Sequence, residues 1–114
     1  MTGIPLVIIE SPYAGDINTN IRYARACMRD SISFGEYPIA SHLLYTQPGI
    51  LDDSIPEERA LGIAAGLAWR KVADKAVFYI DRHWSGGMIS AHKIYRLEGF
   101  PFETRELGRE WQID

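Results

Sequence analysis

The sequence predicts an α/β fold built on a single doubly wound parallel sheet, of the flavodoxin or Rossmann type, with helices on both faces. Apolar runs of strand length alternate along the chain with segments of helical periodicity, and this alternation predicts parallel strands joined by right-handed crossovers. Two of the runs, residues 4–9 and 76–80, are almost wholly apolar, which is typical of strands buried on both faces.

The first strand is predicted at residues 4–9 (IPLVII), with Pro5 near its start, where the missing N–H matters least. A helix is predicted next, because apolar residues recur on one helical face: Ile17, Ile21, Ala24 and Met28. Asp16 or Asn18 can cap the N-terminus of this helix, and Gly35 is a suitable stop.

A second, shorter strand is predicted at residues 37–41 (YPIAS), and a long connection follows at 42–56. Connections of this length within a small domain are usually functional or mobile. A helix then begins near Pro56, an allowed first-turn position, with Glu57 and Glu58 at its positive end. The apolar face of this helix consists of Leu61, Ala64 or Ala65, Ala68 and Val72.

The third strand is predicted at residues 76–80 (AVFYI), and a third helix at about 87–98, closed by Gly99. The segment FPFETREL, residues 100–107, is predicted to form a strand at the edge of the sheet, because it carries Pro101 and several charges. The strands and helices thus alternate along the whole chain.

Length, charge and cysteine content limit the function classes. The 114 residues suit one compact domain, predicted at 1–108 with a polar tail at 109–114. The net charge of −3, with both signs interspersed, argues against a nucleic-acid polymer as partner. No apolar run reaches the ~20 residues that span a bilayer, and no signal peptide is recognisable, so no membrane partner is expected. The single cysteine, Cys27, excludes an internal disulfide and favours a cytoplasmic location.

Polar residues follow the first and third predicted strands directly. In open parallel sheets, ligands bind beyond the carboxyl ends of the strands, so these two loops are the candidate site. The loop after the first strand offers Glu10, Ser11, Tyr13, Gly15 and Asp16. The loop after the third strand offers Asp81, Trp84, Ser85, Gly86, Gly87 and Met88, and the long connection adds Tyr45.

Each of these candidates has a purely structural alternative. Asp16 serves equally well as a helix cap, and Trp84 can cover the core instead of stacking on a ligand. The turn from Ser85 to Gly87 lies at a helix start, where free N–H groups favour an anion, but such turns are often structural. The cysteine and the three histidines show no metal-ligand spacing, so no metal is predicted: Cys27, His42, His83 and His92.

Three motifs, SPYAGD, LDDSIPEERALG and WSGGM, in this order, resemble the nucleoside 2-deoxyribosyltransferase-like superfamily, in particular its small, often phage-borne members. The likeness covers about residues 4–103. It implies a domain that binds a nucleoside or nucleotide at the strand ends, where a glutamate attacks the anomeric carbon and releases the base. Tyr13 and Ser85 match positions that hold sugar or phosphate, and Gly15 and Gly87 match the surrounding glycines. The resemblance also implies a homo-oligomer, and the expected chemistry requires no metal and no redox cofactor.

The sequence departs from the superfamily at its catalytic acids. The glutamate position is occupied by Ala91, and the supporting aspartate would fall near Gly66. Alanine cannot form a glycosyl-enzyme ester or stabilise an oxocarbenium-like centre. The chemistry has therefore either moved to other residues or been lost.

In the first interpretation, Glu10 and Asp81 face one cleft, where they serve as an acid/base pair or position a water for direct hydrolysis of the N-glycosidic bond. His83 is an additional proton carrier in this interpretation. In the second, the pocket binds a nucleotide without cleaving it and serves to sequester or sense it. A third, structural interpretation places both acids in hydrogen-bond networks with Arg25 or Arg82.

We expect an N-glycosidase or deoxyribosyltransferase type of activity on a nucleoside or nucleoside monophosphate, with non-catalytic nucleotide binding as the alternative. Tyr13 and Asp16 then hold the sugar, the turn from Ser85 to Gly87 holds a phosphate, and Trp84 or Tyr45 stacks on the base. A small domain also gains stability by covering apolar surface in an oligomer, for example at Trp69, Phe100 and Trp111.

Overall fold

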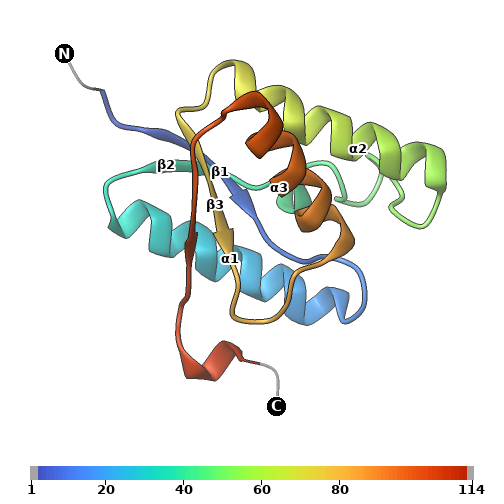
Figure 1. The fold of residues 1–114 in the computed structure, drawn as a ribbon. Coiled ribbons are helices and arrows are strands. Elements are labelled where there is room, and N and C mark those ends of the chain that lie inside the picture. Colours follow the sequence, from blue (N-terminus) through green and yellow to red (C-terminus); the bar gives the residue numbers. More distant parts are fainter. Residues whose placement is uncertain (1–2, 113–114) are drawn as a thin grey trace.

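Four parallel strands in the order β2-β1-β3-β4 form the sheet of the computed structural model, which describes residues 3–112 (Figure 1). The strands are β1 (Leu6–Glu10), β2 (Tyr37–Ile39), β3 (Lys75–Tyr79) and β4 (Phe102–Arg105). The register places Ile8 beside Ile39 on one side and Ala76 on the other. The predicted α/β class with a parallel sheet is confirmed, and β4 is the expected edge strand.

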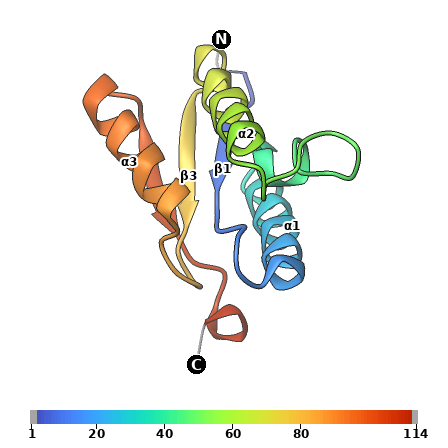
Figure 2. The ribbon, with the colours of Figure 1, turned by 90° about the vertical axis from the view of Figure 1, so that its right-hand side faces the viewer.

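Three helices cover the sheet: α1 (Ile17–Ser33), α2 (Pro56–Ala68) and α3 (Gly86–Glu98). Figure 2 shows α1 and α3 on opposite sides of the strands. The chain moves outward from β1 to β2 in one direction and from β3 to β4 in the other. The topological switch point, where such sheets bind ligands, therefore lies between the carboxyl ends of β1 and β3.

Side chains alternate along each strand, so the sheet separates two apolar cores. The core on the α1 face contains Val7, Ile9, Tyr23, Cys27, Ala40, Val77 and Tyr79. The core on the α3 face contains Ile8, Ala76, Phe78, Met88, Ala91 and Tyr95. Odd-numbered residues of β1 and β3 thus face α1, and even-numbered residues face α3. The same alternation influences the face toward which the polar residues beyond these strands point.

The helix ends follow local capping chemistry. The carboxylate of Asp16 accepts a hydrogen bond from Thr19 N (3.2 Å) and caps α1. Helix α3 ends at Gly99, whose φ of +68° is the left-handed conformation that glycine adopts without strain. The second strand is shorter than predicted, because residues 41–43 already form a 3₁₀ turn that accommodates the crossing to α2.

The chain after β4 returns to the α1 face. Residues 109–111 form a short 3₁₀ turn, and the indole of Trp111 lies 5.5 Å from the ring of Tyr23, centroid to centroid. The segment expected as a polar tail therefore contributes an aromatic side chain to the packing of α1. Residues 113 and 114 of that predicted tail lie outside the described residues.

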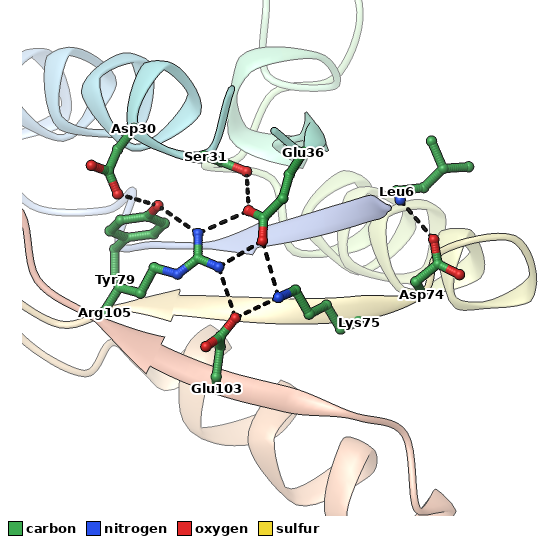
Figure 3. Close-up of polar contacts among 9 residues, drawn as sticks. All are labelled: Leu6, Asp30, Ser31, Glu36, Asp74, Lys75, Tyr79, Glu103 and Arg105. Atoms are coloured by element: carbon green, nitrogen blue, oxygen red, sulfur yellow. Dashed lines mark hydrogen bonds and ion pairs between the residues drawn. The ribbon is translucent and has the colours of Figure 1, made fainter. Parts of the chain in front are cut away.

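A polar network ties β4 and β3 to the end of α1 (Figure 3). The guanidinium of Arg105 donates to both carboxylate oxygens of Glu36, at 2.8 and 2.7 Å. Glu36 is buried and also accepts from Ser31 Oγ (2.7 Å) and pairs with Lys75 Nζ (3.0 Å). This ring of contacts lowers the pKa of Glu36 to about 2, chiefly through Arg105. The edge strand β4 is therefore held by the ion pair of Arg105 with Glu36 as well as by its backbone hydrogen bonds to β3.

Within residues 3–112, no helix is both long and apolar enough to cross a bilayer.

Candidate functional site

The loops after β1 and β3 meet over a shared crevice at the switch point. Its volume is about 410 Å³. The loop after β1 contributes Tyr13, Ala14 and Gly15 to the lining of this crevice. The loop after β3 and the start of α3 contribute His83, Trp84, Ser85, Gly86 and Gly87. The remaining wall comes from the connection after β2 and from α2, through His42, Asp53, Arg59 and Ile63. Two loops far apart in the sequence thus form one concave surface.

Aromatic rings line the crevice from two sides. The Tyr13 ring stacks on His42, with 5.1 Å between centroids and 24° between planes. Burial lowers the pKa of His42, so its imidazole is neutral at pH 7. On the other side, Trp84 stacks on Phe78 at 5.0 Å and keeps 37% of its surface exposed. Flat apolar faces of this kind suit a planar heterocycle.

Glu10 lies deeper, beside a small second cavity of about 50 Å³. This cavity adjoins the crevice, because His42, Ile63 and Gly87 line both. Glu10 accepts a hydrogen bond from Tyr95 Oη, which lowers its pKa, but desolvation by the surrounding protein has the larger effect and raises the pKa to about 7. A carboxyl with this pKa is present in both protonation states at neutral pH.

The expectation that Asp81 shares a cleft with Glu10 is wrong. Glu10 lies level with Phe78, whose side chain belongs to the core on the α3 face. Asp81 follows Phe78 by an odd number of residues, and its carboxylate turns to the α1 face, where it accepts from Tyr23 Oη at 2.6 Å. The two acids therefore flank opposite faces of the sheet.

Asp81 holds the C-terminal segment in place. Its carboxylate accepts hydrogen bonds from the backbone N–H groups of Leu107 and Gly108, each at 2.9 Å, while Tyr23 Oη in turn accepts from Asp81 N. This geometry matches the structural interpretation of the acid, with Tyr23 and backbone amides in place of an arginine as partners.

Replacing Asp81 by alanine is expected to lower the free energy of unfolding by about 2–4 kcal/mol, because the buried hydroxyl of Tyr23 and two amides lose their acceptor. Denaturant unfolding followed by circular dichroism measures the loss. The variant Glu106→Ala removes an exposed carboxylate one residue before Leu107 and serves as the control. Equal stability of the two variants would contradict this role.

The start of α3 combines a cap with free amide groups. Ser85 Oγ accepts from Met88 N at 3.2 Å, which caps the helix and leaves the hydroxyl proton available to a ligand. Gly86 and Gly87 lie in the first turn of α3, at the positive end of its dipole, and both line the crevice. Met88 does not line the crevice: its side chain is 1% exposed and belongs to the core on the α3 face.

Three further predicted residues lie outside the crevice lining. The carboxylate of Asp16 is engaged in capping α1, and Thr19 Oγ1 donates to it at 2.8 Å. Tyr45 lines a neighbouring cavity and accepts from Trp69 Nε1 at 2.8 Å. Ser11 is buried, and its hydroxyl has no hydrogen-bond partner among residues 3–112.

Sequence reasoning assigned no role to Arg59, Asp53 or His42, all of which line the crevice. Arg59 Nη1 lies 3.7 Å from a carboxylate oxygen of Asp53, so the wall contributed by α2 carries a cation whose charge is partly balanced. Asp53 and Arg59 were signalled by the dense charge of LDDSIPEER and by its place in one of the three motifs that carry the family resemblance, whereas no sequence pattern marked His42.

The long connection also bounds a wider cavity of about 530 Å³. Residues 46–54 form one wall, and the loop after β1 forms the other through Tyr13, Gly15 and Ile17. Tyr13 and Gly15 line both this cavity and the crevice, so the loop after β1 lies between the two spaces. Among residues 3–112, no group of three or more side chains of the metal-ligating types is placed to hold a metal ion.

A parallel sheet with a crevice at its switch point defines a Rossmann-like α/β domain. Within that class, a family model described as a domain of unknown function, DUF7768, matches residues 5–105, and the chain belongs to this family. No curated protein and no solved structure matches the chain.

Proposed function

We propose that the protein binds a nucleoside or nucleoside monophosphate in the crevice and acts on its N-glycosidic bond, with Glu10 as the acting carboxyl. One observation carries the proposal: a carboxyl with a pKa near 7 lies beside the crevice formed by the loops after β1 and β3. Perturbed carboxyls next to a concave polar site are the usual signature of acid/base chemistry.

The resemblance to the nucleoside 2-deoxyribosyltransferase-like superfamily supports the same position for the chemistry. Ala91 and Gly66, which fall at or near the positions of that superfamily's two acids, line the same small cavity as Glu10. Glu10 therefore brings a carboxyl from β1 to the cavity that side chains on α3 and α2 would otherwise fill. This favours relocation of the acid over its loss.

Chemically, a single carboxyl of this kind has two uses. In the protonated form it gives its proton to the departing base, which takes the electron pair of the C–N bond. In the ionised form it stabilises positive charge at the anomeric carbon or attacks that carbon, before water or a second base completes the exchange. With a pKa near 7, Glu10 supplies either form at neutral pH.

The remaining crevice residues suit the other parts of a nucleotide. The amides of Gly86 and Gly87, with the hydroxyl of Ser85, offer donors for a phosphate at the positive end of α3. Arg59 adds positive charge from the opposite wall. Tyr13 and Trp84 present the flat faces against which a base would stack.

Release of free base from a panel of nucleosides and their 5′-monophosphates, followed by chromatography, tests this proposal. We expect release from at least one compound, and a loss of at least ~100-fold in the Glu10→Gln variant, the usual cost of removing an acid/base group. Glu106→Gln, which alters an exposed carboxyl, should release base at the wild-type rate. Equal rates in Glu10→Gln and wild type would contradict the role of Glu10.

A double exchange sharpens the test. The variant Glu10→Ala with Ala91→Glu removes the carboxyl from β1 and restores it on α3, across the same small cavity. We expect it to regain part of the base release that Glu10→Ala alone loses, provided that its melting curve shows a folded protein. A folded double variant as inactive as Glu10→Ala would weigh against the assigned position of the chemistry.

Non-catalytic nucleotide binding is the second candidate, and one observation favours it. Glycosidases of most families use two carboxyls, whereas Asp81 faces away and leaves Glu10 without a second acid from the paired loops. In that case, no compound on the panel releases base, but one of them raises the melting temperature. Neither release nor stabilisation by any compound would contradict both candidates.

A further inference from the structure

Helix α2 has an outer face that nothing in the described chain covers. None of its residues is buried, although alanine, leucine, isoleucine and glycine predominate in its sequence. Leu61 is 61% exposed, and Val72, just beyond the helix, is 58% exposed. In Figure 1, α2 lies along the outside of the molecule, and its N-terminal half extends past the strands. A helix face that exposes apolar side chains in this way is a candidate interaction surface.

The two long faces of α2 differ in residue type. The inner face carries Gly62 and Gly66, where an added Cβ would lie 3.6 Å from Leu51 Cδ1 and 3.0 Å from Ser41 Cβ, respectively. Gly66 thus lets α2 rest closely on Ser41, whereas a Cβ at Gly62 would make only an ordinary van der Waals contact. The outer face carries exposed Ala60, Leu61, Ala64 and Ala68, one turn after another. Side chains this small allow a second helix to approach closely.

The charged residues at the two ends of the outer face of α2 indicate what kind of partner can pack on it. Glu57, in the first turn of α2, stands seven residues before Ala64. Lys71, in the 3₁₀ turn that follows the helix directly, stands seven residues after Ala64, and both charged residues are exposed. Within residues 3–112, neither forms an ion pair, whereas Arg59 and Arg70 are paired with Asp53 and Glu98. An identical helix laid antiparallel on this face, with the two-fold axis at Ala64, would place each Glu57 opposite the Lys71 of the other copy.

We infer that the outer face of α2 is a self-association surface, on which a second copy of this chain packs antiparallel across a two-fold axis at Ala64. Such an interface is self-complementary, since each copy presents an acidic end to the basic end of the other. The alanines and Leu61 supply the buried apolar centre, and the two charge pairs at the rim set the direction of packing. This inference stands independently of the proposed nucleotide chemistry.

Charge reversal tests the inference through sedimentation equilibrium of the purified chain across the micromolar range. We expect the wild type to form dimers, and Glu57→Lys or Lys71→Glu alone to weaken dimerisation by about tenfold or more, because each creates two like-charge pairs in the symmetric dimer. Mixing the two single variants should restore dimers, since every facing pair in the mixed species is then of opposite charge. Glu106→Lys, an exposed reversal away from α2, should behave as wild type.

The same measurement can overturn the inference. A wild-type chain that is monomeric throughout the range, or single variants that dimerise as tightly as wild type, would exclude this surface. Dimers that persist in Leu61→Asp, with unchanged helix content by circular dichroism, would also exclude it, because a carboxylate at the centre of the contact cannot be buried unpaired. Failure of the mixture to restore dimers would exclude the antiparallel arrangement.

Discussion

Replacing Arg105 by methionine is expected to lower the free energy of unfolding by about 3–5 kcal/mol, the typical cost of removing one partner from a buried ion pair. Arg105 makes two parallel hydrogen bonds to Glu36, a carboxylate that is only 5% exposed. Without the guanidinium, Glu36 keeps Lys75 and Ser31 as partners but loses its bidentate contact. Methionine preserves most of the apolar stem, so the loss reports the charge.

Denaturant unfolding at neutral pH measures this effect, with Arg109→Met as the matched control because Arg109 is exposed and lies outside the network. The control should change the free energy of unfolding by less than about 0.5 kcal/mol, as surface substitutions usually do. A loss below about 1 kcal/mol in Arg105→Met would contradict the structural role of the network.

The same network gives the acid limb of the stability profile. The pKa of Glu36 falls to about 2 in the folded protein, from 4.5 for an unperturbed glutamate. A depressed carboxylate pKa stabilises the fold above the unfolded value and loses that contribution as the pH falls from 4.5 to 2. Arg105→Met should show a smaller loss over this window, because Glu36 then lacks the main cause of its shift.

Glu10 is expected to change the pH dependence of the free energy of unfolding in the opposite direction to Glu36, by a similar amount. Its pKa is raised to about 7 by desolvation, so between pH 4.5 and 7 the folded chain retains a proton that the unfolded chain releases. Unfolding then releases this proton, and stability falls as the pH rises through that window. The shift corresponds to a loss of about 3 kcal/mol by pH 8, relative to pH 4.5.

The comparison between wild type and Glu10→Gln isolates this contribution. Every other titratable group of the chain is present in both proteins, so the difference between the two stability profiles reports chiefly Glu10. We expect the free energy of unfolding of Glu10→Gln to rise relative to that of the wild type between pH 4.5 and 7. Above pH 8, the difference between the two free energies should be constant. A difference that does not vary with pH would show that Glu10 has an ordinary pKa. Its carboxyl would then be ionised at neutral pH and could not serve as a proton donor.

The sequence alone was enough to predict the alternation of strands and helices and the convergence of two loops on one crevice. Both follow from local signals: apolar runs of strand length, helical periodicity, and glycines at turns. Tyr13 and Ser85 could be placed near each other because parallel strands bring their carboxyl ends to one edge. None of this required knowledge of which residues in neighbouring strands lie level with one another.

The separation of Glu10 and Asp81 could not be predicted for that reason. Which face a side chain takes depends on the parity within its strand and on the register between strands, and the register is set by packing of the whole sheet. Only the pairing of Glu10 with Phe78 shows that the odd offset to Asp81 places the two acids on opposite faces. The partners of Asp81 lie at Tyr23 and Leu107, contacts that no local pattern signals.

Met88 is a different case, because its position was predictable. Met88, Ala91 and Tyr95 recur at helical spacing and form the buried face of α3, as periodicity alone indicates. The pairing of Glu36 with Arg105 lies at the other extreme, since the two residues are separated by 69 positions and meet only when β4 is docked. Sequence patterns predict faces of elements well and long-range polar partners poorly.

We propose above all that the crevice between the loops after β1 and β3 binds a nucleoside or nucleotide. Titration of the ¹⁵N-labelled chain with the nucleoside and monophosphate panel, followed by amide resonances of glycines, tests it most directly. The amides of Gly15, Gly86 and Gly87 line the crevice, whereas Gly35 and Gly99 lie where α1 and α3 end, at the opposite edge of the sheet. We predict saturable shifts at the first three glycines with at least one compound, and none at the other two. Unchanged resonances at the crevice glycines across the whole panel would contradict the claim.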